Sequence, residues 1–463
     1  MPDTPQPISR KGLSIAVILA GSFIPPLLLH SSTLAIPNIA AELRLTAETI
    51  SWFTLINVLA NALFVLPAGK FADIYGRRRV FCVGVVLLTL ACLLSGRANS
   101  EYVLLLGRFL QGIGGAFIFG SALPLVNGIP QEHQKAKLMG MYLSVCYLGV
   151  VLGPLFGGVV LEHLHWRWTF YIPAIILFVI AIAGIGFLHW ERYGNRASRV
   201  RGLDTFLYAI ALSMIALAIF RTHEPLGQGL LLLGLLCFAG FCWFQSKRRD
   251  PLLQVKLFLH NSIYTTLGFT HFFNYCAILA LPFTLTLYLQ YIKGINPQTT
   301  GLILMSQALF TTIVAPMSGR LSSLIRVRYL LFISLTLVFS AMLILSMIAL
   351  ETPIWVVLVC LVMIGLGVGI GDVHMINTSL SSVEDELLGS ASATLNGLRT
   401  MGGFVGIGVV SYLLGQDIGK KEITPDVYPE LLVALQSFFV FAAAICFASL
   451  LSLSVGIWFR SKK

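Results

Sequence analysis

A few charged or titratable side chains lie inside long apolar stretches of this chain, where they are the groups best placed to do chemistry. They are Arg108, Asp372, Arg399 and His30. A charge inside a bilayer is costly, and it usually faces a polar cavity or a partner. Asp372, Arg108 and His30 are therefore our candidates for binding and moving protons.

Each of these groups also has a structural interpretation. At the usual helical rise, Asp372 lies about 28 Å along its helix from Pro353, so it can equally be a solvated acid near the membrane surface. Arg108 can pack on backbone carbonyls, and His30 and His271 can be polar packing groups. The residue types alone leave both interpretations open.

Several other kinds of site are not indicated. The eight cysteines lie in apolar stretches without a C-x-x-C pair, so neither a disulfide framework nor a zinc site is expected. The chain has no G-x-x-x-x-G-K-[ST] loop for ATP, no nucleophile with a base at useful spacing, and no set of metal ligands. We expect no cofactor, no metal and no enzymatic activity. The alternatives of another class are a membrane-embedded enzyme, a channel and a sensor.

The stretches that contain these groups are long enough to cross a membrane. Of the 463 residues, 57% are hydrophobic and only 11% are charged, whereas soluble domains have about 25% charged residues. Runs of about 20 apolar residues, enough to cross a hydrocarbon core, recur along the chain. We predict fourteen spans, at 13–36, 49–69, 79–97, 102–128, 137–161, 167–189, 203–220, 228–246, 263–291, 299–318, 328–349, 353–378, 388–415 and 432–459.

The distribution of Lys and Arg predicts that both termini are cytoplasmic. With the N-terminus inside, 22 of the 31 basic residues lie in cytoplasmic segments, seven lie outside, and Arg108 and Arg399 lie within spans. An excess of this kind is typical of cytoplasmic loops. The net charge of +11 therefore indicates membrane topology rather than binding to nucleic acid.

A weak internal repeat predicts the domain organisation. PAGKFADIYGRRR at 67–79 follows the second span, and PMSGRLSSLIRVR at 316–328 follows the tenth. Duplicated halves are typical of secondary transporters. We expect an all-α integral membrane protein with a six-helix bundle at 1–190, two additional spans within 191–256, and a second six-helix bundle at 257–463.

The loop after the second span contains the first of three motifs. Its pattern, G-x-x-x-D-x-x-G-R-[KR], is filled by Gly69, Asp73, Gly76, Arg77 and Arg78. This pattern resembles that of the major facilitator superfamily. The resemblance implies that Asp73 and Arg77 contact helix ends across the two halves and act as a latch. An ordinary basic loop that sets topology is the alternative. In the second half Ser323 stands in place of the acid, so an equal latch is not expected there.

The fourth span resembles the second motif of the superfamily, L-x-x-x-R-x-x-Q-G-x-G-x-A. The pattern is filled by Leu104, Arg108, Gln111, Gly112, Gly114 and Ala116. In the family this arginine is associated with proton transfer. Arg108 can assist it by altering the pKa of a neighbouring carboxyl group.

The fifth span resembles the third motif, G-x-x-x-G-P-x-x-G-G, which marks antiporters within the superfamily. The pattern is filled by Gly149, Gly153, Pro154, Gly157 and Gly158. Glycines four residues apart form a groove that lets another helix approach closely. The proline removes one backbone hydrogen bond and bends the helix. Helix packing without a transport role is the alternative.

With these motifs in order, the chain is identified as a member of the fourteen-span drug:H+ antiporter family. The resemblance covers nearly the whole chain and implies the major facilitator fold. Arg399, in LNGLRTMGG, matches an arginine common in that family. The first span departs from the family, because it has no acid where members often have an aspartate. His30 is the only titratable side chain there, which leaves proton coupling by that route unsupported.

By analogy with the family, the first, fourth, ninth and twelfth spans contribute to a substrate cavity. Candidates for its lining are Phe117, Phe119, His271, Asn274, Tyr275, Asn377 and Arg399. Apolar walls with a few polar anchors suit an amphipathic organic compound. Each aromatic side chain can instead simply pack.

These observations predict a secondary active exporter of the multidrug type, which exchanges amphipathic small molecules for protons by alternating access. The alternative with the same fold is a lipid or metabolite exporter that is not proton-coupled. We expect a monomer in the cell membrane, specifically a bacterial plasma or inner membrane. Its partners are then the small-molecule substrate, protons and the lipid bilayer.

Overall fold

The computed structural model describes residues 8–127, 135–188, 202–219, 225–248, 251–384 and 388–458. Within these residues the secondary structure is helical, apart from an isolated bridge between Thr46 and Glu422. Fourteen of the described helical segments are long and apolar enough to cross a membrane. The prediction of fourteen spans is therefore confirmed.

The helices follow the predicted spans closely, with short additional helices between some of them. The first part of the chain forms α1 (Ile8–Leu34), α2 (Ile36–Leu43), α3 (Ala47–Tyr75), α4 (Arg77–Gly96), α5 (Glu101–Asn127), α6 (Lys135–His163) and α7 (Trp168–Phe187). A pair follows, α8 (Gly202–Ile219) and α9 (Pro225–Ser246). The remainder forms α10 (Val255–His260), α11 (Ser262–Ile278), α12 (Leu281–Leu287), a π-helical turn (Tyr288–Ile292), α13 (Pro297–Leu321), α14 (Val327–Leu345), α15 (Ile354–Leu380), α16 (Leu388–Asp417), a 3-10 turn (Pro425–Val427) and α17 (Tyr428–Trp458).

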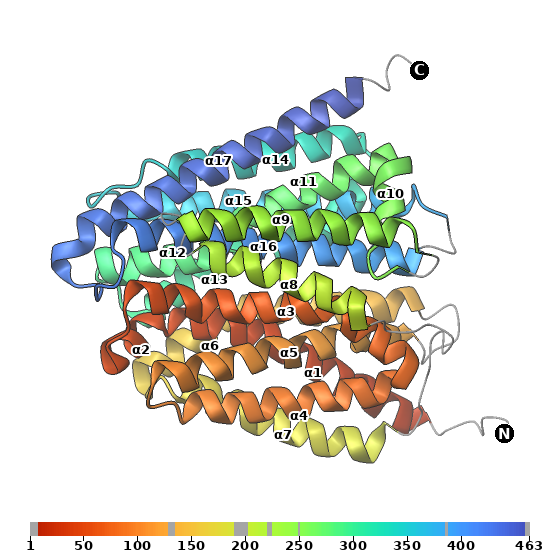
Figure 1. Cartoon of the computed structure of the whole chain (residues 1–463), viewed down its shortest axis with the longest axis horizontal. Helices are drawn as coiled ribbons and strands as arrows, with labels where there is room; N and C mark the ends of the chain where they lie inside the picture. Colours follow the sequence, from red (N-terminus) through yellow and green to blue (C-terminus); the bar gives the residue numbers. More distant parts are fainter. Residues whose placement is uncertain are drawn as a thin grey trace.

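The long helices lie roughly parallel to one another in two groups (Figure 1). Helices α1 to α7 lie in one half of the molecule, and α10 to α17 lie in the other. The start of α1 and the end of α17 lie at the same end of the helices, which we call the near end, and α2 lies at the opposite, far end. The domain boundaries at 190 and 256 and the cytoplasmic position of the termini stay predictions.

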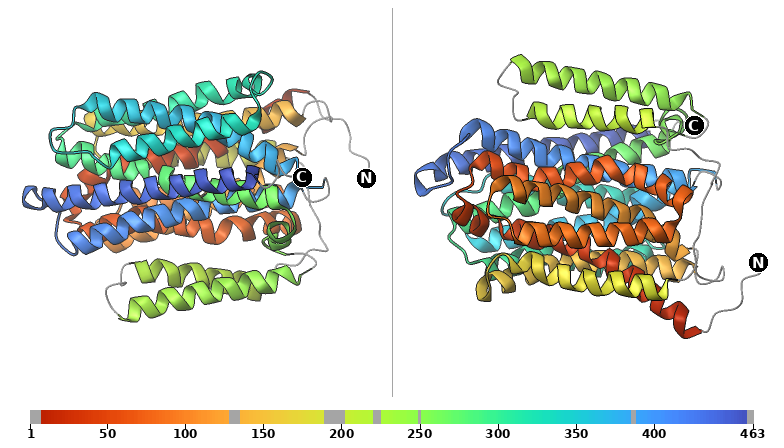
Figure 2. Two further views of the ribbon diagram at one scale, coloured as in Figure 1. Left: turned by 90° about the horizontal axis from the view of Figure 1, so that it is seen from above. Right: turned by 60° about the horizontal axis from the view of Figure 1, so that its bottom comes forward.

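The α8–α9 pair stands beside the two groups rather than within either of them (Figure 2). The Tyr208 hydroxyl on α8 donates a hydrogen bond to the Ala62 carbonyl on α3, at 2.9 Å. At the far end of α8, Ile219 packs against Gly408 on α16. Helix α8 therefore contacts both halves of the molecule at the place where α3 and α16 meet.

The ninth span was expected as one segment at 263–291, but it is interrupted after Ile278. The reason is Pro282, which has no N–H to bond the carbonyl four residues earlier and so cannot continue a regular helix from Ile278. The chain resumes as α12 and then as the π-helical turn. Glycines of α16 allow close approach to the break, since a Cβ at Gly403 or Gly406 would collide with Leu279 or the Cys276 carbonyl.

Candidate functional site

A buried acid lies in the second half, where α11 and α15 pack together. Asp372 on α15 is 3% exposed, and its Oδ2 accepts a hydrogen bond of 2.5 Å from the Tyr275 hydroxyl on α11. Its Oδ1 lies 3.8 Å from Nδ1 of His271, which is 2% exposed. Neither Oδ1 nor Nδ1 has a hydrogen-bond partner. The interpretation of Asp372 as a solvated acid at the membrane surface does not fit this burial.

Arg399 on α16 belongs to the same cluster. Its guanidinium lies over the Tyr275 ring, 4.6 Å from the ring centroid. It also interacts electrostatically with Asp372 and, across the molecule, with Tyr147 on α6. The stacked ring thus connects a fixed positive charge to the carboxylate, and a change in the charge of Asp372 is felt at Arg399.

Asn274 and His374 differ in how their polar atoms are satisfied. Asn274 is fully buried on α11, and both polar atoms of its amide lack a partner. His374 is two residues beyond Asp372, and its Nε2 lies 3.2 Å from the Ser318 carbonyl on α13. His374 is therefore part of the packing, whereas Asn274 has unused hydrogen-bonding capacity.

A second buried charge lies in the first half of the molecule. Arg108 on α5 is fully buried and donates to the Ser32 hydroxyl on α1, the Phe53 carbonyl on α3, and Oε1 of Gln111 on its own helix. Its guanidinium also lies over the Phe53 ring, at 4.4 Å. Nε2 of Gln111 in turn donates to the Ser95 hydroxyl. Arg108 thus joins three helices through neutral acceptors.

No carboxylate lies within ion-pair distance of Arg108 among the residues that the structure describes. The expectation that Arg108 acts on a neighbouring carboxyl group therefore finds no such group in this arrangement. The two buried clusters contain different chemistry, since only the cluster in the second half contains an acid.

The glycines of the antiporter motif lie on α6 against α1. A Cβ on Gly149 would lie 2.5 Å from the Phe23 carbonyl oxygen, and one on Gly157 would lie 2.8 Å from Cα of Ser31. Gly153 faces the Leu27 carbonyl and Cβ of His30 in the same way. Helix α6 is continuous through Pro154. Three glycines at a spacing of four thus form the groove expected from the motif, and α1 occupies it.

The remaining positions of the motif face α13 of the other half. A Cβ on Gly158 would lie 2.9 Å from Cα of Gln298, and Gly301 packs directly on the Pro154 carbonyl. These contacts lie toward the far end, where Nε2 of Gln290 also donates to the Leu34 carbonyl at 3.1 Å. One motif therefore serves two interfaces, one within the first half and one between the halves.

A short backbone contact also joins the halves at the far end. Thr46, at the start of α3, forms an antiparallel bridge with Glu422 in the segment between α16 and α17. The Ala47 N–H donates to the Lys421 carbonyl at 3.0 Å. Together with the contacts of Gly158 and Gly301, this bridge closes the far end between the halves.

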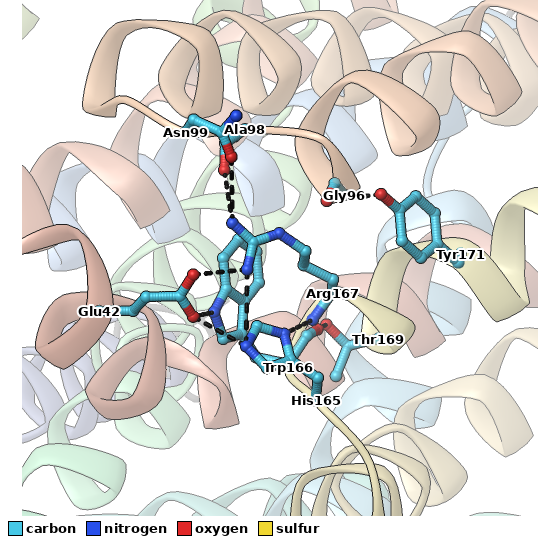
Figure 3. A network of polar contacts seen from close by, with 9 residues as sticks. All are labelled: Glu42, Gly96, Ala98, Asn99, His165, Trp166, Arg167, Thr169 and Tyr171. Carbon is cyan, nitrogen blue, oxygen red and sulfur yellow. Dashed lines mark hydrogen bonds and ion pairs between the residues drawn. The ribbon is translucent and has the colours of Figure 1, made fainter.

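A polar network holds the far end of the first half together (Figure 3). The Glu42 carboxylate on α2 accepts hydrogen bonds from the Trp166 indole N–H at 2.6 Å and from Arg167 at 2.5 Å, and His165 lies 2.9 Å away. Arg167 also donates to the Ala98 carbonyl at 3.1 Å. Partial burial opposes ionisation, but these bonds outweigh it and hold the pKa of Glu42 below its usual range.

The latch motif lies at the near end, and its described contacts stay within the first half. Arg77 donates to Oδ1 of Asp73 at 2.9 Å and to the Pro124 carbonyl on α5 at 3.1 Å. Arg78 donates to the Ile185 carbonyl on α7 at 3.3 Å. Gly76 has a φ of 108°, a conformation that favours glycine and allows the turn between α3 and α4. Gly69 lies near the Gly120 carbonyl.

His30 lies at the centre of the molecule rather than in either buried cluster. It lines a small pocket between the halves, together with Pro154, Pro282, Gln307 and other residues of α6, α12, α13 and α15. The volume of the pocket is only about 10 Å³, far below the roughly 300–1,000 Å³ of typical ligand sites. In this arrangement the pocket is thus too small for a drug-sized compound.

The predicted cavity residues are only partly brought together. His271, Tyr275 and Arg399 lie around Asp372, as described above. Phe117 instead packs against Gly84 on α4, with its ring 6.4 Å from that of Phe71. Phe119 is half-buried on α5, and Asn377 is exposed near the end of α15. The cluster on α11, α15 and α16 is therefore the best-defined part of the predicted lining.

Sequence reasoning missed the contacts that close the far end. Glu42 lies on the short helix α2, and Trp166 and Arg167 directly precede α7; nothing in their spacing indicates that they meet. The pairing of Thr46 with Glu422 joins segments that are far apart in the chain. The one signal in the sequence was that these residues lie next to the ends of predicted spans. That position does not indicate which residues they contact.

Comparisons with known proteins agree with this architecture. The family model of the Major Facilitator Superfamily matches residues 13–264 and 267–463. The chain is 29% identical to a puromycin resistance protein of Streptomyces alboniger over 88% of this chain and 82% of that protein. It is 28% identical to a multidrug transporter of Bacillus subtilis, over 83% and 72% of the two chains. A riboflavin transporter of Clostridioides difficile is 24% identical over 96% and 97%.

Proposed function

Because this chain belongs to the Major Facilitator Superfamily, we propose that it exports amphipathic small molecules in exchange for protons by alternating access. The protein is a multi-pass membrane transporter with bacterial relatives. The proposal concerns its direction, its coupling ion and its cargo. We propose a monomer in a bacterial plasma membrane, with the near end cytoplasmic as the distribution of basic residues predicts.

The observation that supports proton coupling is the environment of Asp372. A carboxylate excluded from water is tolerated only if partners stabilise its charge or a proton neutralises it. Asp372 has one hydrogen bond, from Tyr275, and one oxygen without a partner. Its charge is therefore stabilised only in part, which makes it a group that can exchange a proton during transport.

The names of relatives support an aromatic, amphipathic cargo. One relative is named for resistance to puromycin and another for transport of riboflavin. Both named compounds combine ring systems with polar groups. In this chain the aromatic ring of Tyr275, the guanidinium of Arg399 and the free amide of Asn274 offer stacking and hydrogen bonding to such a compound.

The arrangement of contacts supports a state that is closed at the far end. Backbone pairing of Thr46 with Glu422 and packing of Gly158 on Gln298 join the halves there. The latch residues Asp73 and Arg77 bond within the first half, and Gly140 and Gly319 near the other end of α6 and α13 have open space around them. We infer that this is the state facing the cytoplasm, in which the latch is released.

Transport by the purified protein in proteoliposomes tests the coupling. With an imposed pH gradient, the wild type should accumulate puromycin or riboflavin, whereas Asp372→Asn should lose gradient-driven accumulation. Asp204→Asn is the matched control, because Asp204 is also a buried acid within a span. Unlike Asp372, it lies in the α8–α9 pair, where its Oδ1 is 3.8 Å from Nη2 of Arg248. Gradient-driven accumulation by Asp372→Asn at the wild-type rate would contradict the proposal.

A reversible cross-link tests alternating access. Paired residues in an antiparallel bridge have Cα atoms about 4.5–5.5 Å apart, within the range of about 4.4–6.8 Å that a disulfide spans. Oxidation of a Thr46→Cys, Glu422→Cys double variant should therefore abolish transport, and a reductant should restore it. The two single variants control for the loss of each side chain. Undiminished transport by the fully cross-linked protein would show that the far end does not open.

A second candidate is an exporter of the same fold that uses no protons. The observation that favours it is α1, which contains His30 as its only titratable side chain within the described part of the membrane span. In that case cargo should equilibrate across the vesicle membrane at a rate that is independent of the pH gradient, in the wild type as in Asp372→Asn.

A further inference from the structure

We propose that His271 and Asp372 hold the exchanged proton together, between Nδ1 of the imidazole and Oδ1 of the carboxylate. Neither the sequence motifs nor the names of the relatives assign a role in proton exchange to His271. The proposal rests on the proposed function, because it concerns the site at which the coupling proton binds. The proton-binding site then consists of two side chains, His271 and Asp372, instead of Asp372 alone.

The first argument is the position of two unsatisfied atoms. Nδ1 of His271 and Oδ1 of Asp372 face each other at 3.8 Å, and both lack a hydrogen-bond partner. Two buried polar atoms left unpaired cost free energy, and native structures rarely leave them so without a reason. A separation of 3.8 Å is too long for a hydrogen bond, but a side-chain movement of about 1 Å brings the two atoms within hydrogen-bond distance. One proton placed between the atoms satisfies both.

The second argument is the lack of room for anything larger. His271 is 2% exposed and Asp372 is 3% exposed, and the two unpaired atoms are out of contact with solvent. A water molecule or a metal ion needs space between its ligands, whereas a proton needs none. The occupant that fits the observed packing is therefore a proton.

The third argument is the charge that surrounds the pair. On α11 the only other titratable neighbour of Asp372 that the structure describes is Tyr275, which donates to Oδ2. Arg399 approaches from α16 and Tyr147 from α6. Helix α14 presents the Ser334 hydroxyl to the neighbouring Gly371, and its bond goes to the Gly367 carbonyl.

These charges balance only in one protonation state. With Asp372 ionised and His271 neutral, the negative carboxylate offsets the positive guanidinium of Arg399. Uptake of one proton by the pair leaves the positive charge of Arg399 unopposed. Proton binding therefore changes the net charge of the cluster from neutral to positive, which disfavours a cationic cargo and links the two binding events.

The proton transfer itself needs no other reactant. A proton from the aqueous phase on the open side forms an O–H bond at Oδ1 of Asp372 and is donated toward Nδ1 of His271, and the O–H bond breaks when the proton leaves on the other side. Tyr275 is a positioning residue, because it keeps Oδ2 occupied and so leaves Oδ1 to face His271. His374 is not part of the pair, since its ring nitrogen lies against the Ser318 carbonyl.

Infrared titration of the purified protein in lipid tests the proposal without any cargo. The carboxyl and carboxylate bands of Asp372 are those that disappear in Asp372→Asn, and they are followed against pH. Two acceptors hold one proton more tightly than either holds it alone, so in His271→Gln the midpoint should move to lower pH by about one unit or more. His374→Gln is the matched control, and its midpoint should equal that of the wild type.

The outcomes separate this inference from the proposed function. An unchanged midpoint in His271→Gln, with bands that still titrate, would overturn the shared site and leave Asp372 as a single proton acceptor. Bands that do not titrate at any pH would overturn both proposals. His271→Asn provides a second variant if His271→Gln does not reach the membrane, and the same midpoint is then compared with that of His374→Gln.

Discussion

The two halves of the molecule each bury an arginine, but they treat its charge differently. Arg108 in the first half donates to a hydroxyl, a carbonyl and an amide oxygen, with no acid nearby among the described residues. Arg399 in the second half stacks on Tyr275, whose hydroxyl binds Asp372. The first arrangement holds one positive charge among neutral groups, whereas the second places a carboxylate and an imidazole beside its arginine.

This difference indicates that the two buried clusters have different roles, one structural and one in proton coupling. Arg108 joins α1, α3 and α5 and so acts as a fixed structural centre in the first half. Both clusters have an unpaired buried atom, since Nη2 of Arg108 also lacks a partner, but only the cluster of Asp372, His271 and Arg399 contains an acid and an imidazole that can hold a proton. Loss of the first cluster should therefore affect mainly stability, and loss of the second should affect mainly coupling.

The largest effect on stability is expected for Arg108→Gln. The substitution removes the donor to Oε1 of Gln111, and a buried group left unpaired costs about 1–3 kcal/mol. The free energy of unfolding, measured in mixed micelles with increasing denaturing detergent, should fall by about that amount. Asp372→Asn should cost much less in the same assay. Equal destabilisation by both variants would remove the contrast between the halves.

A smaller effect, on transport, is expected for Tyr275→Phe. The variant keeps the ring under Arg399 but loses the hydrogen bond to Asp372, and a bond to a charged group contributes about 1.5–3 kcal/mol. Gradient-driven transport should therefore fall by about tenfold or more, with a changed dependence on pH. Tyr264→Phe is the control, because its hydroxyl binds the Ala391 carbonyl elsewhere on α11 and α16. If both variants transport alike, the position of Oδ2 does not matter for coupling.

The smallest effect is expected for Glu42→Gln, in the exposed network at the far end. The Glu42 side chain is 37% exposed, so its ion pair with Arg167 contributes at most about 1 kcal/mol. Because the bonds lower the pKa of Glu42, the contribution is present at neutral pH and is lost below about pH 4.

The melting temperature measures this effect. The wild type should melt slightly above Glu42→Gln at neutral pH, and the two should converge in acid. A difference that grows as the pH falls would reverse the expected sign. It would mean that the network stabilises the protonated form of Glu42.

Much of the fold could be predicted from the sequence, because membrane insertion demands long apolar helices. Spans with unbroken apolar runs, such as 79–97, correspond to single helices. The ninth span lies where it was predicted, at Ser262–Ile292, but its break next to Pro282 was not predicted, since this proline lies in an otherwise apolar run. Proline is tolerated in membrane helices, so its presence alone does not tell a bend from a break.

The site could be predicted less completely. The type and apolar context of Asp372 and Arg108 marked them as unusual, and both are buried. Their partners depend on which helices pack together, and one sequence does not define that. The proximity of His271 to Asp372, which joins α11 and α15, could not be inferred from spacing along the chain. For the same reason Phe117 was expected in a cavity but packs against α4.

Proton release on cargo binding tests the central contrast most directly. Puromycin or riboflavin, whichever the wild type transports, is added to the purified protein in weakly buffered detergent solution with a pH-sensitive dye. The wild type and Arg108→Lys should both release protons, and Asp372→Asn should bind the compound without release. Undiminished release from Asp372→Asn, or loss of release from Arg108→Lys with binding intact, would contradict the assignment of proton exchange to the second half.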